Sequence, residues 1–185
     1  MKQKSNKSKN KNSWIWPLIV LILAISLSLI FSIASELILS KSTKTIAIIV
    51  IFIFITIAIL TDMVGLAVAS ASVEDFNAMA ARKVKGSKQA ISLVKNADKV
   101  SSVLNDVIGD VCGILSGAAG ASIVAKIIID NAGNFMVVLI ASLVASIIAG
   151  ITIGGKAIFK RIAIKHANSI TLSFAKFINF FTRRG

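Results

Sequence analysis

The 185-residue sequence has little of what soluble proteins use for structure and chemistry: one cysteine, one histidine, one proline, no tyrosine and eight acidic residues. The lone Cys112 excludes an internal disulfide framework, and the lone His166 excludes a zinc site built from several Cys and His. The chain also lacks a Walker loop, a G-x-S-x-G nucleophile elbow and an H-E-x-x-H motif. We therefore expect no enzyme activity, no catalytic residue and no cofactor-binding residue.

Hydrophobic residues, in contrast, make up 56% of the chain, and charged residues only 16%. Soluble globular proteins are about 45–50% apolar and about 25% charged. A helix needs about 20 apolar residues to cross a bilayer. Four runs meet this length, at about 14–40, 45–71, 103–129 and 135–155. The sequence thus predicts an all-α membrane protein with about four transmembrane helices.

The second run is rich in β-branched residues, which favour a strand in water. In hydrocarbon an unpaired strand leaves its backbone groups without hydrogen bonds, so we expect a helix. The predicted organisation is a disordered basic tail at 1–13, a transmembrane domain at 14–158 and a cytoplasmic amphipathic tail at 159–185. The polar connection 72–101 predicts an amphipathic helical hairpin at the membrane interface, because apolar residues recur there at helical spacing among basic ones.

Basic residues are distributed unevenly among the connections. The N-terminal tail carries five, the connection 72–101 carries six, and the segment from Lys156 onward carries seven. The other connections contain only Lys41, Lys44 and Lys126. The positive-inside rule therefore places both termini and the connection 72–101 in the cytoplasm.

The same distribution explains the net charge of +13 without nucleic acid, because basic connections also attract anionic lipid. We expect the lipid bilayer as the partner and no nucleic acid. The abundance of Lys, Asn and Ile is typical of an AT-rich bacterial genome, so we expect a multi-pass protein of a bacterial plasma membrane.

The first apolar run has an alternative interpretation. Residues 1–34 could be a cleaved signal peptide rather than a membrane anchor, since Ser32-Ile33-Ala34 resembles a cleavage site. The apolar stretch is longer than a typical signal sequence, which favours an uncleaved anchor.

Acidic residues inside the apolar runs are the candidates for function. Asp62 lies in the second run, and Asp106 and Asp110 lie one turn apart near the cytoplasmic end of the third. A charged Asp at the centre of a membrane helix costs about 2.5–3.5 kcal/mol, so each needs a partner. With Asn105 nearby, these side chains offer the oxygen ligands that suit Mg²⁺, Ca²⁺ or Mn²⁺. Asp106 could instead be a merely interfacial residue, and Asp62 could be a hydrogen-bond clamp between helices.

Glycines recur every fourth residue beside these acids, at Gly109, Gly113 and Gly117. Such a stripe lets another helix approach closely. We expect it to bring helices together so that the acids converge with Asp62, and it also favours a homodimer.

Several segments follow one another in a distinctive order and spacing. They are Ala69 to Ser72, Phe76, Met79-Ala80, Asn96 to Lys99, Ile108 to Asp110, Gly155 to Lys160, and Ile162 to Ala167. This order resembles the membrane domain of the cyclin-M/CorB–CorC magnesium and cobalt transporter family, over roughly residues 60–185. The resemblance implies a dimer of three-span domains with a belt of cytoplasmic helices and an ion site between the spans. It implies Ser70 and Asp110 as site residues and Mg²⁺ as the bound or transported ion, so the predicted metal site comprises Asp62, Ser70, Asn105, Asp106 and Asp110.

The chain departs from that family at important positions. Lys156 stands where the family has a signature Glu, Phe159 stands where it has Pro, and the Glu expected in the second run falls near Gly65. These 185 residues contain no stretch that resembles the family's usual CBS and C-terminal domains, so we expect that a separate cytoplasmic regulatory chain could supply their role.

Three interpretations follow. In the first, Asp62, Asp106 and Asp110 replace the lost acids, and the protein binds or moves a divalent cation. In the second, Lys156 occupies the cation's place and pairs with an Asp, which leaves a non-transporting scaffold or regulatory subunit. A third, a membrane-perturbing protein with a cationic tail, is disfavoured because such activity needs only one amphipathic helix. Three costly intramembrane acids favour the first interpretation.

Overall fold

The computed structural model describes residues 15–41, 44–128 and 134–182, and all regular structure in these ranges is helical. The elements are α1 (Ile15–Lys41), α2 (Lys44–Ser70), α3 (Val73–Ala81), α4 (Ser87–Lys95), α5 (Ala97–Ser102), the π-helical segment η1 (Val103–Gly109), α6 (Asp110–Ile128), α7 (Asn134–Lys165) and α8 (Ala167–Thr182). The predicted tail 1–13 lies outside the described residues.

Four helical stretches are long and apolar enough to cross a membrane: Ile15–Leu37, Thr45–Ser70, Ala97–Val124 and Phe135–Lys165. For the described residues, this confirms the prediction of an all-helical structure with four helices that are long and apolar enough to be transmembrane. The Ile-rich second run is helical in spite of its β-branched residues, since a helix satisfies every backbone group within one segment.

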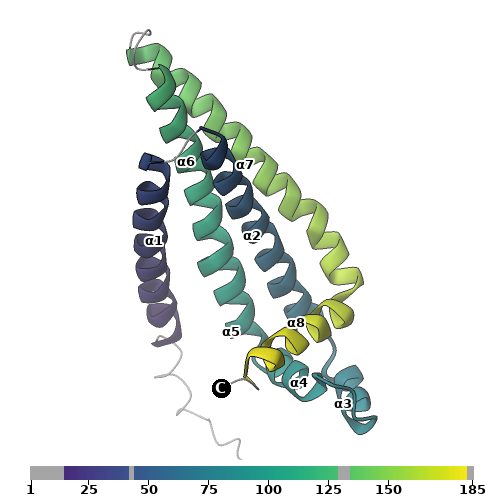
Figure 1. The fold of residues 1–185 in the computed structure, drawn as a ribbon. Coiled ribbons are helices and arrows are strands. Elements are labelled where there is room, and N and C mark those ends of the chain that lie inside the picture. Colours follow the sequence, from purple (N-terminus) through teal and green to yellow (C-terminus); the bar gives the residue numbers. More distant parts are fainter. Residues whose placement is uncertain (1–14, 42–43, 129–133, 183–185) are drawn as a thin grey trace, which may run out of the picture.

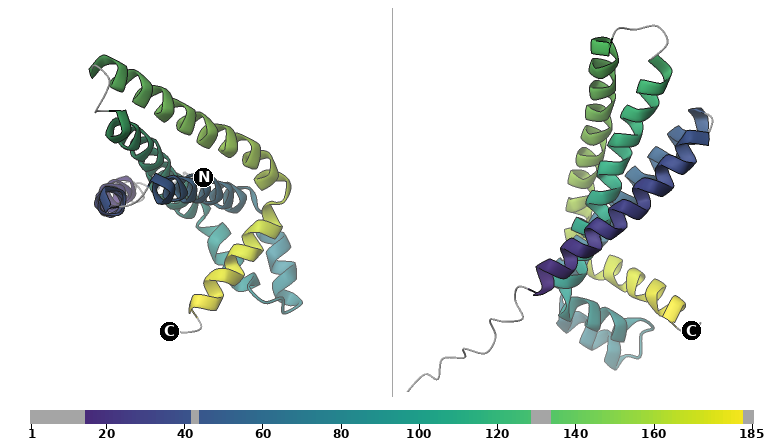
Figure 2. Two further views of the ribbon diagram at one scale, coloured as in Figure 1. Left: turned by 45° about the horizontal axis from the view of Figure 1, so that its top comes forward. Right: turned by 90° about the vertical axis from the view of Figure 1, so that its left-hand side faces the viewer.

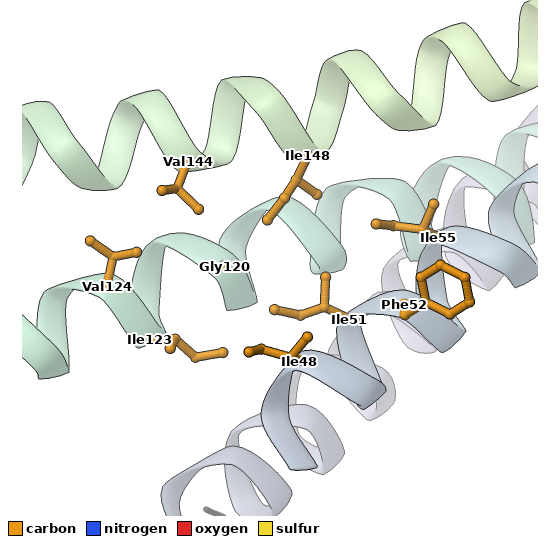
Figure 3. A pocket seen from close by; sticks show the side chains of 9 residues that line it. All are labelled: Ile48, Ile51, Phe52, Ile55, Gly120, Ile123, Val124, Val144 and Ile148. Atoms are coloured by element: carbon orange, nitrogen blue, oxygen red, sulfur yellow. The ribbon is translucent and has the colours of Figure 1, made fainter. Parts of the chain in front are cut away.

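Helix α6 lies at the centre of the long helices and packs against α7, α2 and α1 (Figure 1). Its small residues permit this packing: a Cβ at Gly120 would overlap the Ile148 side chain of α7. At this contact, α2, α6 and α7 line a wholly apolar groove of about 410 Å³ (Figure 3). The isoleucines Ile48 and Ile51 line it from α2.

The short helices α3, α4 and α5 gather with α8 at one end of the long helices, and we call these four helices the helical base (Figures 1 and 2). Phe76 of α3, Ala90 of α4 and Ala175 of α8 are completely buried against one another. The amide of Gln89 donates a hydrogen bond to Asn179 across the α4–α8 contact, at 3.0 Å. The start of α1 lies at this same end, because Lys99 Nζ lies 5.0 Å from the Trp16 ring centroid.

Two expected boundaries differ in the structure. The fourth long helix does not end near 155 or 158 but continues to Lys165. Gly154 and Gly155 do not interrupt it, and α7 packs against α2. The expected tail is therefore divided at His166, where α7 ends; α8 then runs back across the end of α2 and packs against α4. The third long helical stretch starts at Ala97 rather than near 103.

Candidate functional site

Three charged side chains from three different helices meet near the start of α6. The ammonium Nζ of Lys156, on α7, lies 2.8 Å from Asp110 Oδ1 and donates a hydrogen bond to it. The same Nζ lies 3.8 Å from Asp62 Oδ1 on α2. We call these residues the Asp–Lys–Asp cluster. Two carboxylates against one ammonium leave it with a formal charge of −1.

The cluster is only partly shielded. The side chains of Lys156 and Asp62 are 19% and 23% exposed, whereas that of Asp110 is 60% exposed. Asp110 and Lys156 border a groove of about 500 Å³ between α6 and α7. Its remaining walls are small or apolar, with Gly113, Gly117 and Ala149 among them. One face of the Asp–Lys–Asp cluster is therefore reachable from outside the protein.

Glycines on both sides of α2 allow the three helices to come this close. A Cβ at Gly155, next to Lys156, would overlap the Ile59 side chain of α2. A Cβ at Gly109, next to Asp110, would lie only 3.3 Å from Thr61 Oγ1, beside Asp62. We expected Gly109 to let another helix approach closely so that the acids converge. The close approach of α2 at Thr61 agrees with this expectation.

Asn105, from the π-helical segment, lies beside α2 rather than at the cluster's ion pairs. Its Oδ1 is buried and has no hydrogen-bond partner in the part of the chain that the structure describes. A Cβ at Gly65 would overlap this oxygen, so glycine is needed for the amide to sit there. Sequence reasoning missed this contact, although the resemblance pointed to Gly65 as a lost acid. π-Helical insertions are often found at functional sites.

Asp106 has a local partner. Its Oδ2 accepts a hydrogen bond from Ser102 Oγ at 2.8 Å, and the residue is exposed. Asp106 belongs to the π-helical segment, where the i→i+5 bonding pattern changes the angular spacing that an α-helix gives to Asp106 and Asp110. We expected both Asp106 and Asp110 to converge with Asp62. In the structure only Asp110 does so, because Lys156 forms ion pairs with both Asp110 and Asp62.

Ser70 also lies away from the Asp–Lys–Asp cluster, at the end of its helix. It is the last residue of α2, two turns beyond Asp62, or about 12 Å at 1.5 Å per residue. There it borders a polar pocket of the base together with Ser72, Lys165 and His166. Among the described residues, no group of three or more His, Cys, Asp or Glu side chains is placed to hold a metal ion.

The arrangement matches the expectation that Lys156 pairs with an Asp, and it adds Asp62 as a second, longer contact. Chemically, the two carboxylates of the cluster hold the Lys156 ammonium, and the remaining charge of −1 can attract a second cation from outside the protein. Comparison with protein-family models, with curated proteins and with solved structures finds no match for this chain.

Proposed function

We propose that this protein is a multi-pass membrane protein whose cation site is occupied by its own Lys156, and that it acts as a scaffold or regulatory subunit rather than as a transporter. The observation that carries the proposal is the 2.8 Å contact between Lys156 Nζ and Asp110 Oδ1. The Lys156 ammonium lies next to the carboxylates of Asp110 and Asp62, in the position that a bound metal ion would need.

Electrostatics supports this interpretation. At an effective dielectric constant of about 20, an Mg²⁺ ion 4 Å from an ammonium is repelled by about 8 kcal/mol, which offsets about half of its attraction to two carboxylates at the same distance. The ammonium also relieves the carboxylates, each of which costs about 2.5–3.5 kcal/mol in a membrane helix. The three charges therefore stabilise one another without a metal ion, and Mg²⁺ binding would require Lys156 to move away.

The topology belongs to the same proposal. The helical base and the start of α1 share one end of the molecule, and the base is rich in basic residues. By the positive-inside rule this end faces the cytoplasm of a bacterium, with the long helices in the plasma membrane. A second copy could cover the groove beside Asp110, since Gly113, Gly117 and Ala149 leave room for a close helix contact. A separate cytoplasmic chain would bind at the base.

Mg²⁺ binding to the purified protein tests the proposal. Wild-type protein should bind no Mg²⁺ at the cluster, and Lys156→Glu should create binding by replacing an ammonium with a third carboxylate. Lys160→Glu is the matched control, because Lys160 is exposed on the same helix one turn further on. Binding by wild-type protein that Asp110→Asn removes would refute the proposal.

A second candidate function is a cation carrier in which the ion displaces Lys156. The buried, unpartnered Asn105 Oδ1 favours it, because an unsatisfied buried acceptor is unusual and can accept a metal ion or a water. The residual charge of −1 on the cluster favours it too. This candidate predicts that Mg²⁺ competes with the Lys156–Asp110 pair, so that Lys156→Met raises the Mg²⁺ affinity of a protein that already binds the ion.

A further inference from the structure

A second polar site lies in the helical base, away from the Asp–Lys–Asp cluster. It is a pocket of about 220 Å³ between the end of α2 and the corner where α7 meets α8. Polar side chains form most of its wall: Ser70, Ser72, Lys165, His166, Asn168 and Ser169. No step of the proposed function uses it.

Hydrogen bonds across the chain hold the wall of this pocket in place. The Asn168 side chain accepts from the backbone N–H of Ser72 at 3.1 Å and donates to the Asp75 carboxylate. Ser72 is the residue before α3, yet its side chain makes no capping hydrogen bond. Its hydroxyl is therefore not used by the helix and is available to a ligand.

The charge of the pocket and of its surroundings favours an anion. Lys165 and His166 line it directly, and the Asp75 carboxylate is already hydrogen-bonded to Asn168. Residues 72–101 and 157–182 together contain ten Lys and Arg against three acids, Glu74 and Asp98 being the other two. Helices α3 and α8 begin at the pocket, but α2 and α7 end there, so the helix dipoles oppose one another and the basic side chains carry the attraction for an anion.

The position of the pocket identifies the source of the anion. Two long apolar helices, α2 and α7, end at Ser70 and Lys165, so the pocket lies where a membrane meets water. Ile164, which lines the pocket and is 53% exposed, presents apolar surface next to it. A ligand with a phosphate group at this level and apolar chains beside Ile164 matches both the polar and the apolar surface. We propose that the pocket binds the phosphate group of an anionic phospholipid.

Native mass spectrometry of protein from detergent with added phosphatidylglycerol tests this. Wild-type protein should retain the lipid, and Lys165→Ala/His166→Ala should bind it about tenfold more weakly, because a hydrogen bond to a charged group is worth about that factor. Lys160→Ala/Lys176→Ala removes basic charge outside the pocket and should bind like wild type. Lys165→Arg should keep most of the binding, which separates lost charge from lost folding.

The remaining outcomes overturn the proposal. Equal losses in the pocket variant and in the control variant would mean that the base attracts lipid only by its total charge. Unchanged binding in the pocket variant would place the lipid elsewhere. Binding of inorganic phosphate in place of phosphatidylglycerol, lost in the pocket variant, would identify a soluble phosphate compound as the ligand. None of these results depends on whether the cluster at Lys156 binds Mg²⁺.

Discussion

Removal of the ammonium in Lys156→Met should destabilise the folded protein measurably. It leaves Asp110 and Asp62 without their shared cation. Breaking a buried ion pair costs about 3–5 kcal/mol, because the remaining charge is left uncompensated. Asp110 is 60% exposed, and exposed pairs are worth only about 0–1 kcal/mol, so the expected loss lies between these limits, at about 1–3 kcal/mol.

A double-mutant cycle separates this pairing from lost packing. Asp110→Asn removes one carboxylate, and in the double variant Lys156→Met/Asp110→Asn fewer charges are left unpaired. We expect the double variant to be more stable than the sum of the two single losses by about 1 kcal/mol or more. Equilibrium unfolding in detergent micelles measures each free energy, and Lys160→Met is the control, expected within about 0.5 kcal/mol of wild type. A coupling energy of zero would refute the reasoning.

Three further changes test the packing around the site and in the base. Gly65→Ala should destabilise the protein by about 1–3 kcal/mol, because the new Cβ overlaps Asn105 Oδ1, whereas Gly117→Ala meets nothing within 4 Å and should be tolerated; thermal unfolding of both variants decides this. Asn105→Leu removes a buried, unpartnered oxygen and should change stability far less than a typical loss of a buried polar group; if unfolding shows a loss of several kcal/mol, the oxygen has a partner such as a metal ion. Phe76→Ala should cost about 3–5 kcal/mol and loosen the base, since its ring is fully buried between α4 and α8; rapid proteolysis within 72–101 checks this, and an unchanged cleavage pattern would contradict it.

The sequence predicts the four long helices well, because twenty apolar residues in a row have few alternatives in a bilayer. It does not predict the end of α7 at Lys165, since Lys156 and Lys160 look like the start of a polar tail while the helix continues past them. A helix can continue past its first charged residue when that charge is paired, and Lys156 forms ion pairs with Asp62 of α2 and Asp110 of α6.

The candidate site was only partly predictable for the same reason. The cost of a buried acid points to Asp62 and Asp110, but their partner comes from a residue 46 positions further along the chain than Asp110. The spacing of Asp106 and Asp110 assumes an α-helix, and the π-helical segment changes it. The family resemblance alone points to Ser70, and its place in the pocket depends on how the end of α2 packs against α8.

Mg²⁺ flux into proteoliposomes tests the central claim most directly. Purified wild-type protein is compared with protein-free vesicles and with Asp110→Asn, under an inward Mg²⁺ gradient. If Lys156 holds the cation position permanently, wild-type protein gives the flux of empty vesicles, and Asp110→Asn gives the same. Flux through the wild-type protein that Asp110→Asn abolishes would contradict the account and identify a carrier whose ion displaces Lys156.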